Sequence, residues 1–144
     1  MARVKLKFPN RKPLFIAKIP LRISDMNYGN HLGNDTFLSI IHEARVQWLQ
    51  SLSYTELNVG GCGLIMADAM IAYKNQAYYG DIVHVEIFID EISGKSFDVL
   101  YKLSVQKGET LQLIAEAKTG MACFDYQNQK ISTIPSLFLS QLQE

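Results

Sequence analysis

Hydrophobic residues recur with a helical period in one early segment of the chain. Between residues 35 and 52 a single stripe holds Phe37, Ile41, Ala44, Trp48 and Leu52. Ile40 and Leu49 widen this stripe to nearly half of the circumference, whereas a surface helix needs an apolar arc of only ~100°. The pattern therefore predicts one long helix over 35–52 that a curved sheet wraps.

Polar and apolar residues alternate through most of the remaining chain, which is typical of strands. Strands are predicted over 13–24, 63–74, 81–91, 96–106, 110–124 and 130–133, with a short helix over 136–142. One face of each of the strands over 81–91 and 96–106 should point into the core. The residues on these faces are Val83, Val85, Ile87, Ile89, Phe97, Val99, Tyr101, Leu103 and Val105. In the second strand the odd-numbered residues from Gly63 to Tyr73 are predicted to share a face. Pro20 lacks a backbone N–H, so the first strand should lie at a sheet edge.

A long helix within a run of antiparallel strands indicates an α+β architecture. The chain has 144 residues, of which 48% are hydrophobic, and shows no linker or repeat, so a single domain over 1–144 is expected. One helix covers only one face of a sheet. The other face carries apolar candidates that self-association would cover: Leu64, Met66, Met70, Ile82 and Phe88.

Charge and cysteine usage narrow the function classes. The net charge is zero, with 14 basic and 14 acidic residues, which argues against nucleic acid as the main partner. Residues 1–22 are nevertheless basic and hold no acid, so they form either a solvated edge strand or a patch that attracts a phosphorylated ligand. Cys62 and Cys123 show no metal-binding spacing and are expected to be reduced core thiols. No apolar run suits a secretory signal or a membrane span, so a cytoplasmic location is expected.

Residues 22–45 combine a strand end, a polar turn and a helix start. Gly29 and Gly33 allow the backbone to turn sharply and to approach a ligand. Asn34 or Asp35 can cap the helix that begins beside them. A helix start has free N–H donors and a positive dipole end, which suit a developing oxyanion. A developing oxyanion is therefore expected near residues 33–35.

Three motifs in sequence order resemble the hot-dog-fold acyl-CoA thioesterases, in the branch of the 4-hydroxybenzoyl-CoA thioesterases. The first combines an Asp-x-Asp pair, a Gly-His turn and a later Glu-x-Ala-Arg, which stand here as Asp25-Met26-Asn27, Asn30-His31-Leu32-Gly33-Asn34, Phe37-Leu38 and Glu43-Ala44-Arg45. The second is Ile71-Ala72-Tyr73 followed by Gly80-Asp81-Ile82-Val83, and the third is Phe124-Asp125 followed by Ile134-Pro135. The resemblance covers nearly the whole chain. It implies a hot-dog fold, in which one long central helix is wrapped by a curved antiparallel sheet of about five to six strands.

The same resemblance implies an enzyme that hydrolyses acyl-CoA thioesters. The second apolar face of the sheet predicts that the chain forms a homodimer or homotetramer. The resemblance implies no cofactor, since coenzyme A is part of the substrate. In many members the second Asp of the Asp-x-Asp pair is the nucleophile or base. That position is Asn27 here, and an amide can do neither job, although it can still donate a hydrogen bond to the carbonyl.

Glu43 is the candidate replacement carboxylate, because other hot-dog thioesterases carry an acidic residue on the central helix. The alternative is that Glu43 is a solvated helix residue near Gln47. Asp25 is the competing carboxylate, or a turn residue that hydrogen-bonds the loop. His31 either polarises the thioester carbonyl or locks the turn through its ring nitrogens.

The remaining candidates would bind substrate. Gly33, Asn34 and Asp35 lie at the helix start, and Tyr28 is a candidate pocket wall. Tyr73 ends the strand of the second motif. Asp68 interrupts an apolar strand, so it either faces a neighbouring subunit's site or makes a polar edge contact. No metal-ligand spacing links the histidines.

Two other functions fit the same fold. Loss of the usual carboxylate at Asn27 favours a non-catalytic binder of acyl or aromatic ligands. A dehydratase is a third hypothesis, but the Gly33-Asn34-Asp35 region does not resemble the motif of those enzymes.

Overall fold

A computed structural model describes all 144 residues. Five long strands are present: β1 (Phe15–Pro20), β2 (Gly63–Tyr73), β3 (Ile82–Asp90), β4 (Ser96–Lys107) and β5 (Thr110–Asp125). A short strand β6 (Lys130–Ile131) follows them, and the helices are α1 (Phe37–Ser51) and α2 (Ser136–Leu142). Two 3-10 turns, η1 (Ile23–Asp25) and η2 (Asn34–Thr36), lie between β1 and α1. Neither helix is long and apolar enough to cross a membrane.

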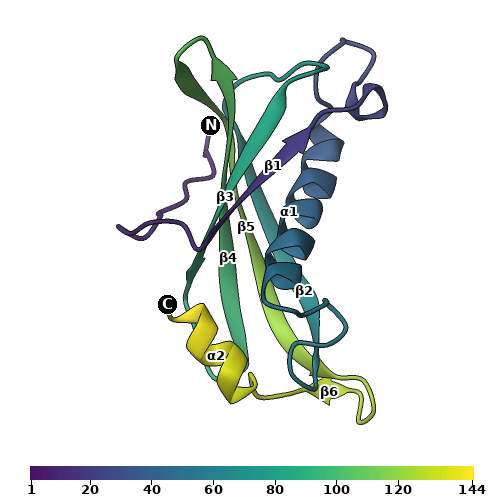
Figure 1. Cartoon of the computed structure of the whole chain (residues 1–144), viewed down its shortest axis with the longest axis vertical. Coiled ribbons are helices and arrows are strands. Elements are labelled where there is room, and N and C mark those ends of the chain that lie inside the picture. The colour runs from purple at the N-terminus through teal and green to yellow at the C-terminus, as the bar shows by residue number, and fades with distance from the viewer.

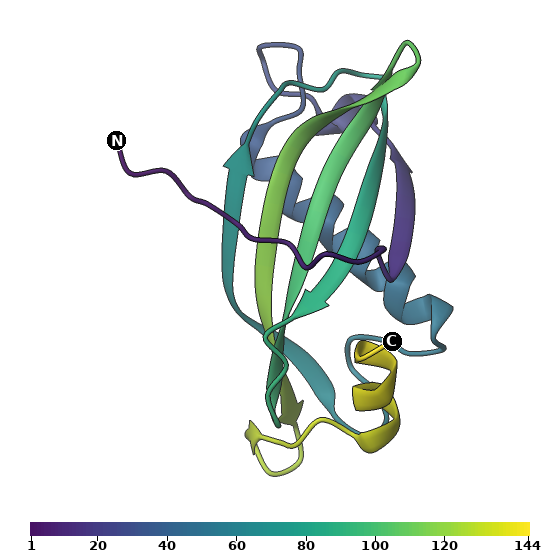
Figure 2. The same cartoon turned by 90° about the vertical axis from the view of Figure 1, so that its left-hand side faces the viewer.

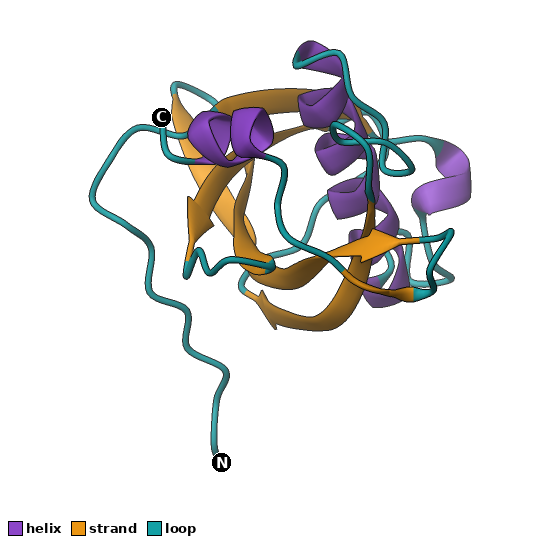
Figure 3. Cartoon of the chain, turned by 90° about the horizontal axis from the view of Figure 1, so that it is seen from below, coloured by secondary structure: helices purple, strands orange, loops and turns teal.

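The strands form one antiparallel sheet that curls around α1 (Figures 1 and 3). Its order is β1-β3-β4-β5-β2, with β6 paired to the end of β5. Pro20 ends β1, which lies at an edge as its missing N–H requires. The α+β hot-dog prediction is thus confirmed, with a shorter first strand than 13–24.

The core lies between the concave face of the sheet and α1. The inward residues predicted on β3 and β4 are at most 1% exposed, and the predicted helical stripe is buried from Phe37 to Trp48. At the lower end of Figure 1, α2 inserts Phe138, whose ring packs against Trp48, Tyr54 and Phe97. The apolar stripe of α1 is therefore buried from Phe37 to Trp48, and α2 closes the core at the Trp48 end.

β2 departs from the predicted alternation. Its pairing with β5 shifts between Met66 and Asp68, where a bulge inserts an extra residue. Before the bulge the even-numbered Leu64 joins the core, and after it the odd-numbered Ile71 packs against the core. The prediction of one face from Gly63 to Tyr73 is therefore wrong, because an extra residue switches the side that each position faces.

The N-terminal residues also differ from the prediction. Residues 1–14 form an extended arm that runs across the outer face of the sheet (Figure 2). The Phe8 ring packs edge-on against Phe88, with centroids 5.4 Å apart, and the Lys102 ammonium lies 4.8 Å from the Phe8 centroid. Phe88 is consequently buried within a single chain, while Met66 and Met70 on β2 remain exposed.

Candidate functional site

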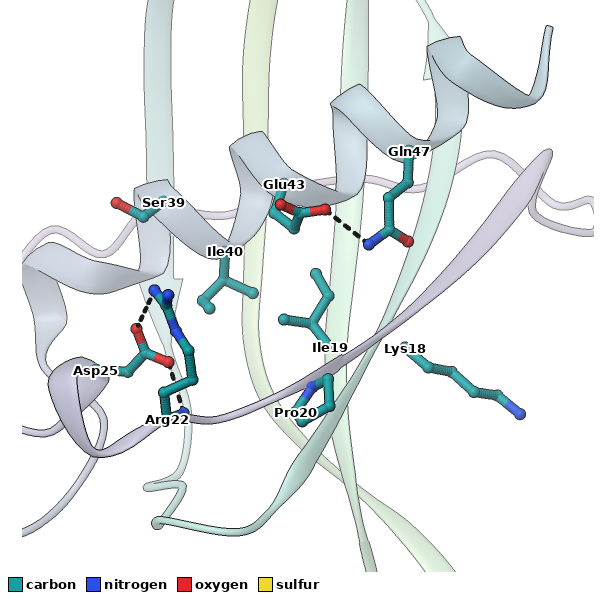
Figure 4. A pocket seen from close by; sticks show the side chains of 9 residues that line it. All are labelled: Lys18, Ile19, Pro20, Arg22, Asp25, Ser39, Ile40, Glu43 and Gln47. Carbon is teal, nitrogen blue, oxygen red and sulfur yellow. Dashed lines mark hydrogen bonds and ion pairs between the residues drawn. The ribbon is translucent and has the colours of Figure 1, made fainter.

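Three pockets surround the N-terminal half of α1. The α1–β1 pocket, about 300 Å³, lies between β1, η1 and one side of α1 (Figure 4). The helix-start pocket, about 280 Å³, lies between the turn before α1 and the end of β2. The α1–β2 pocket, about 210 Å³, lies on the other side of α1, and Ser39 lines both it and the α1–β1 pocket.

The helix start presents free hydrogen-bond donors. The Leu32 N–H donates to the Ala77 carbonyl and the Gly33 N–H to the Asp25 carbonyl, but the N–H groups of Asn34 and Asp35 have no acceptor in the chain. They belong to the first turn, whose N–H groups have no partner within the helix. Two donors at the positive end of a helix can stabilise a carbonyl oxygen that becomes negative.

The predicted helix cap does not form. Gly33 precedes η2 and Thr36 precedes α1, and neither position has a side-chain cap. A Cβ on Gly33 would lie only 2.7 Å from Asp35 Oδ1 and 3.3 Å from Thr36 Oγ1. The Asp35 side chain thus folds back over Gly33 and does not bond a backbone N–H, and a side chain at position 33 would displace the Asp35 carboxylate.

Asp25 and Glu43 line the same pocket but differ in environment. Asp25 is 4% exposed, and its Oδ2 accepts a 2.7 Å hydrogen bond from the Arg22 N–H. Its Oδ1 pairs with Arg22 Nη2 at 3.4 Å. Glu43 is exposed and accepts a 2.8 Å bond from Gln47, with Ile40 between the two carboxylates in Figure 4. Asp25 therefore has a structural role in η1, while Glu43 is open to a ligand or water.

Asn27 holds the turn before the helix. Its Oδ1 accepts from the Gly29 N–H at 2.9 Å and from the His31 N–H at 3.4 Å. The His31 Nδ1 lies 3.2 Å from the Leu32 carbonyl oxygen, which can only accept, so Nδ1 donates to it. His31 lines the helix-start pocket together with Asn34.

The other predicted residues are more scattered. Tyr28 is fully exposed at the turn. The Tyr73 hydroxyl donates to the Asn34 carbonyl at 2.9 Å, and its ring packs on Phe37, so it anchors the helix start to β2. Asp68 accepts a 2.8 Å bond from Lys118, which lowers the pKa of its carboxyl. Asp68 thus makes the polar sheet contact that was one of its two predicted roles.

A buried network on the α1–β2 side was not predicted. Glu56 Oε2 accepts from Arg45 Nε at 2.8 Å, and its Oε1 lies 2.5 Å from His42 Nε2. Arg45 Nη1 donates to the Tyr101 hydroxyl at 3.1 Å, and that hydroxyl lies 2.8 Å from Thr119 Oγ1. Although burial opposes both charges, the hydrogen bonds and the mutual attraction within this cluster lower the pKa of Glu56 and raise that of Arg45.

One sequence signal could have revealed this network. When the Glu-x-Ala-Arg pattern is aligned on Ala44-Arg45, its Glu falls on His42, and Glu43 stands at the variable position. Residues three apart share a helix face, so Arg45 lacks the carboxylate that the pattern would place beside it. Glu56, from the loop after α1, supplies that carboxylate instead. Nowhere in the chain do three or more His, Cys, Asp or Glu side chains gather closely enough to hold a metal ion.

Comparison with known proteins agrees with this architecture. A model of the thioesterase-like superfamily matches residues 21–142, and no curated protein matches the chain. Slr0204, a 1,4-dihydroxy-2-naphthoyl-CoA thioesterase from Synechocystis, superimposes with a TM-score of 0.79 at 25% identity, covering 90% of this chain and 96% of its own. A DHNA-CoA thioesterase from Staphylococcus aureus gives 0.77 at 17% identity, with 89% of each chain covered. The gentisyl-coenzyme A thioesterase BH1999 gives 0.76 at 18% identity, covering 89% and 99%.

Proposed function

The chain belongs to the thioesterase-like superfamily, and from this premise we propose that it hydrolyses an acyl-CoA thioester to a free acid and coenzyme A. The observation that carries the proposal is the helix start, where the Asn34 and Asp35 N–H groups are free. Asn34 lines the helix-start pocket with His31, and Glu43 lines the separate α1–β1 pocket farther along the helix. The structural neighbours whose names specify a substrate act on aryl-CoA thioesters, which supports the same bond as the target.

In this proposal the thioester carbonyl lies against the two free N–H groups. Water attacks the carbonyl carbon and gives a proton to Glu43, while the oxyanion is stabilised by Asn34 and Asp35. The carbon–sulfur bond then breaks, and the departing thiolate of coenzyme A takes up the proton that Glu43 received, which restores the Glu43 carboxylate. Removing one such N–H donor typically lowers the rate ~10²–10³-fold.

The α1–β1 pocket has a basic rim that suits coenzyme A. Lys18 and Arg22 both line it, and both are exposed. We place the phosphates of the nucleotide near these cations, because charge-assisted hydrogen bonds to phosphate are strong. The thioester would then lie deeper, between Ser39 and the helix start.

We further propose that the protein self-associates through β2. β2 is an edge strand, and residues 66–70 are all exposed, including Met66 and Met70. An exposed apolar edge strand is a template for pairing with a second strand. Light scattering at micromolar concentration should give two or four times the mass of one chain, and Met70→Lys should lower it; a monomeric wild type would contradict self-association.

The proposed hydrolysis is tested by a thiol-release screen across acyl-CoAs of different length and aromatic character. Glu43→Gln should lower kcat/KM at least ~10²-fold, the usual contribution of a general base. Glu109→Gln, at an exposed position in the β4–β5 turn, is the matched control and should leave the rate unchanged. If Asp25→Asn abolishes turnover in a folded protein while Glu43→Gln does not, the roles of the two carboxylates are reversed.

One observation favours a second candidate, a non-catalytic acyl-CoA binder. Asn27 uses its Oδ1 on the turn, and Glu43 makes the Gln47 contact of an ordinary surface carboxylate. Calorimetry paired with thiol release separates the two functions. Tight binding of acyl-CoAs without hydrolysis, across short, long and aromatic acyl groups, would overturn the proposed thioesterase function.

A further inference from the structure

The α1–β2 pocket contains an arginine that is only partly satisfied. Arg45 is 5% exposed, and its Nε and Nη1 donate to Glu56 and Tyr101. Its Nη2 group has no hydrogen-bond partner in the chain, although Arg45 lines the pocket. Ser132 Oγ is the only fully buried side-chain polar atom without a partner, so Arg45 Nη2 is accessible from the pocket, where a charged acceptor can reach it.

A second donor reaches the same pocket through Tyr101. Tyr101 is fully buried, and its hydroxyl contacts only Arg45, which cannot accept a hydrogen bond, and Thr119. The Tyr101 proton therefore goes to Thr119 Oγ1. The Thr119 hydroxyl is left to donate its own proton, and Thr119 lines the pocket at 1% exposure.

These two donors lack acceptors within the chain. The rest of the lining is partly apolar, with Leu38, Ile41 and Met66, and partly polar, with Ser39 and His42. Glu56 divides its two oxygens between Arg45 and His42, which leaves the Nη2 side of the guanidinium open to a second carboxylate.

We propose that the α1–β2 pocket binds the acyl group of the substrate through a carboxylate at the end of that group. This inference rests on the proposed thioesterase function. Ser39, which is exposed on α1, lines both pockets, and the proposal has the acyl group cross the helix surface at Ser39. The apolar walls pack against the body of the acyl group. Arg45 and Thr119 donate to its terminal oxygens, which only accept hydrogen bonds.

The test compares acyl-CoAs with and without a terminal carboxylate. Glutaryl-, adipyl- and suberyl-CoA are each paired with the straight-chain acyl-CoA of the same carbon number. At the best length, wild type should favour the carboxylated substrate at least ~30-fold in kcat/KM. Thr119→Val and Arg45→Lys should each reduce this ratio about tenfold, because each removes a donor to an ionised acceptor.

Thr110→Val, an exposed position on the same strand, is the matched control and should keep the ratio. Circular dichroism melts establish that each variant is folded. Hydrolysis without a preference for carboxylated substrates at any length would overturn this inference but would still support the proposed thioesterase function. Absence of hydrolysis for every acyl-CoA would instead overturn the proposed function.

In that second case the pocket is tested by direct binding. Calorimetric titration with adipate and with uncharged adipamide should show binding of adipate only, and Thr119→Val should weaken it about tenfold. Equal behaviour of adipate and adipamide would overturn the carboxylate site.

Discussion

Cys62 and Cys123 lie against each other at the junction of β2 and β5. Both are free and buried, as their apolar sequence context predicted. Burial, reinforced by the contact with the Cys62 thiol, raises the pKa of Cys123 to about 12. Because the thiolate is the reactive form, this thiol is inert in the folded protein.

Thiol labelling measures this directly. At pH 8 a disulfide reagent should modify Cys123 at least ~100-fold more slowly in the native protein than in concentrated guanidinium chloride. The unfolded sample is the control, since both thiols are accessible there. Rapid labelling of the native protein would contradict the burial of this pair.

Asn27 shows how a single side chain can stabilise a turn. Its side-chain oxygen accepts from two backbone N–H groups of the loop before α1. A carboxylate offers the same acceptor, so the turn needs an oxygen at this position and not an amide.

Two substitutions separate these roles. Asn27→Asp should leave the free energy of unfolding nearly unchanged, while Asn27→Ala should lower it by ~1 kcal/mol through the lost hydrogen bonds. Urea denaturation of both variants provides the measurement. An Asn27→Asp variant that gains thiol-release activity over an inactive wild type would instead identify the chain as a degenerate binder.

At the scale of elements, Arg45 and Glu56 tie α1 to the loop that follows it. Glu56 belongs to the connection between α1 and β2, and its carboxylate bridges Arg45 and His42 on the helix. Although burial opposes its charge, these partners lower the pKa of Glu56. A lowered folded-state pKa adds stability above the unfolded value, and that stability is lost as pH falls through the folded value.

Acid unfolding measures how much the pairing of Glu56 with Arg45 and His42 contributes to stability. Below about pH 4.5, the ordinary value of a Glu carboxyl, wild type should lose stability more steeply than Glu56→Gln. At pH 7 the variant should be less stable by about 1.5–3 kcal/mol, the contribution of hydrogen bonds to charged groups. Glu109→Gln serves as the control. Parallel pH profiles for wild type and Glu56→Gln would show that the pair contributes no linkage.

At the scale of the whole molecule, the outer face of the sheet and its β2 edge are used differently. The arm covers Phe88 on the outer face, and the basic residues of the arm lie outside the sheet. The β2 edge stays open. Self-association is therefore expected at the edge, although the sequence argument placed it on the face.

Phe8→Ala distinguishes the two surfaces. It should lower the free energy of unfolding by ~1–3 kcal/mol and increase the binding of a hydrophobic dye, because Phe88 loses its cover. The mass in light scattering should not change. Lys7→Ala, an exposed neighbour in the arm, is the control. A fall in mass with Phe8→Ala would place the arm within the interface.

The local sequence pattern determined the elements of this protein. Strand alternation and the helical stripe predicted the inward faces of α1, β3 and β4, because the backbone period alone fixes which side chains share a face. The prediction failed on β2, where a bulge that no periodicity reveals changes the register. It also failed at the helix start, where the Asp35 side chain folds over Gly33.

The candidate site was likewise predicted only in part. The sequence predicted the helix start and the carboxylates near it, because those groups lie within one continuous segment. The Arg45–Tyr101–Thr119 chain depends on residues 56 and 18 positions apart, which only the pairing of β4 with β5 and the packing of α1 bring together. Whether a donor is satisfied or free depends on such distant partners, so the α1–β2 pocket exists only in the tertiary structure.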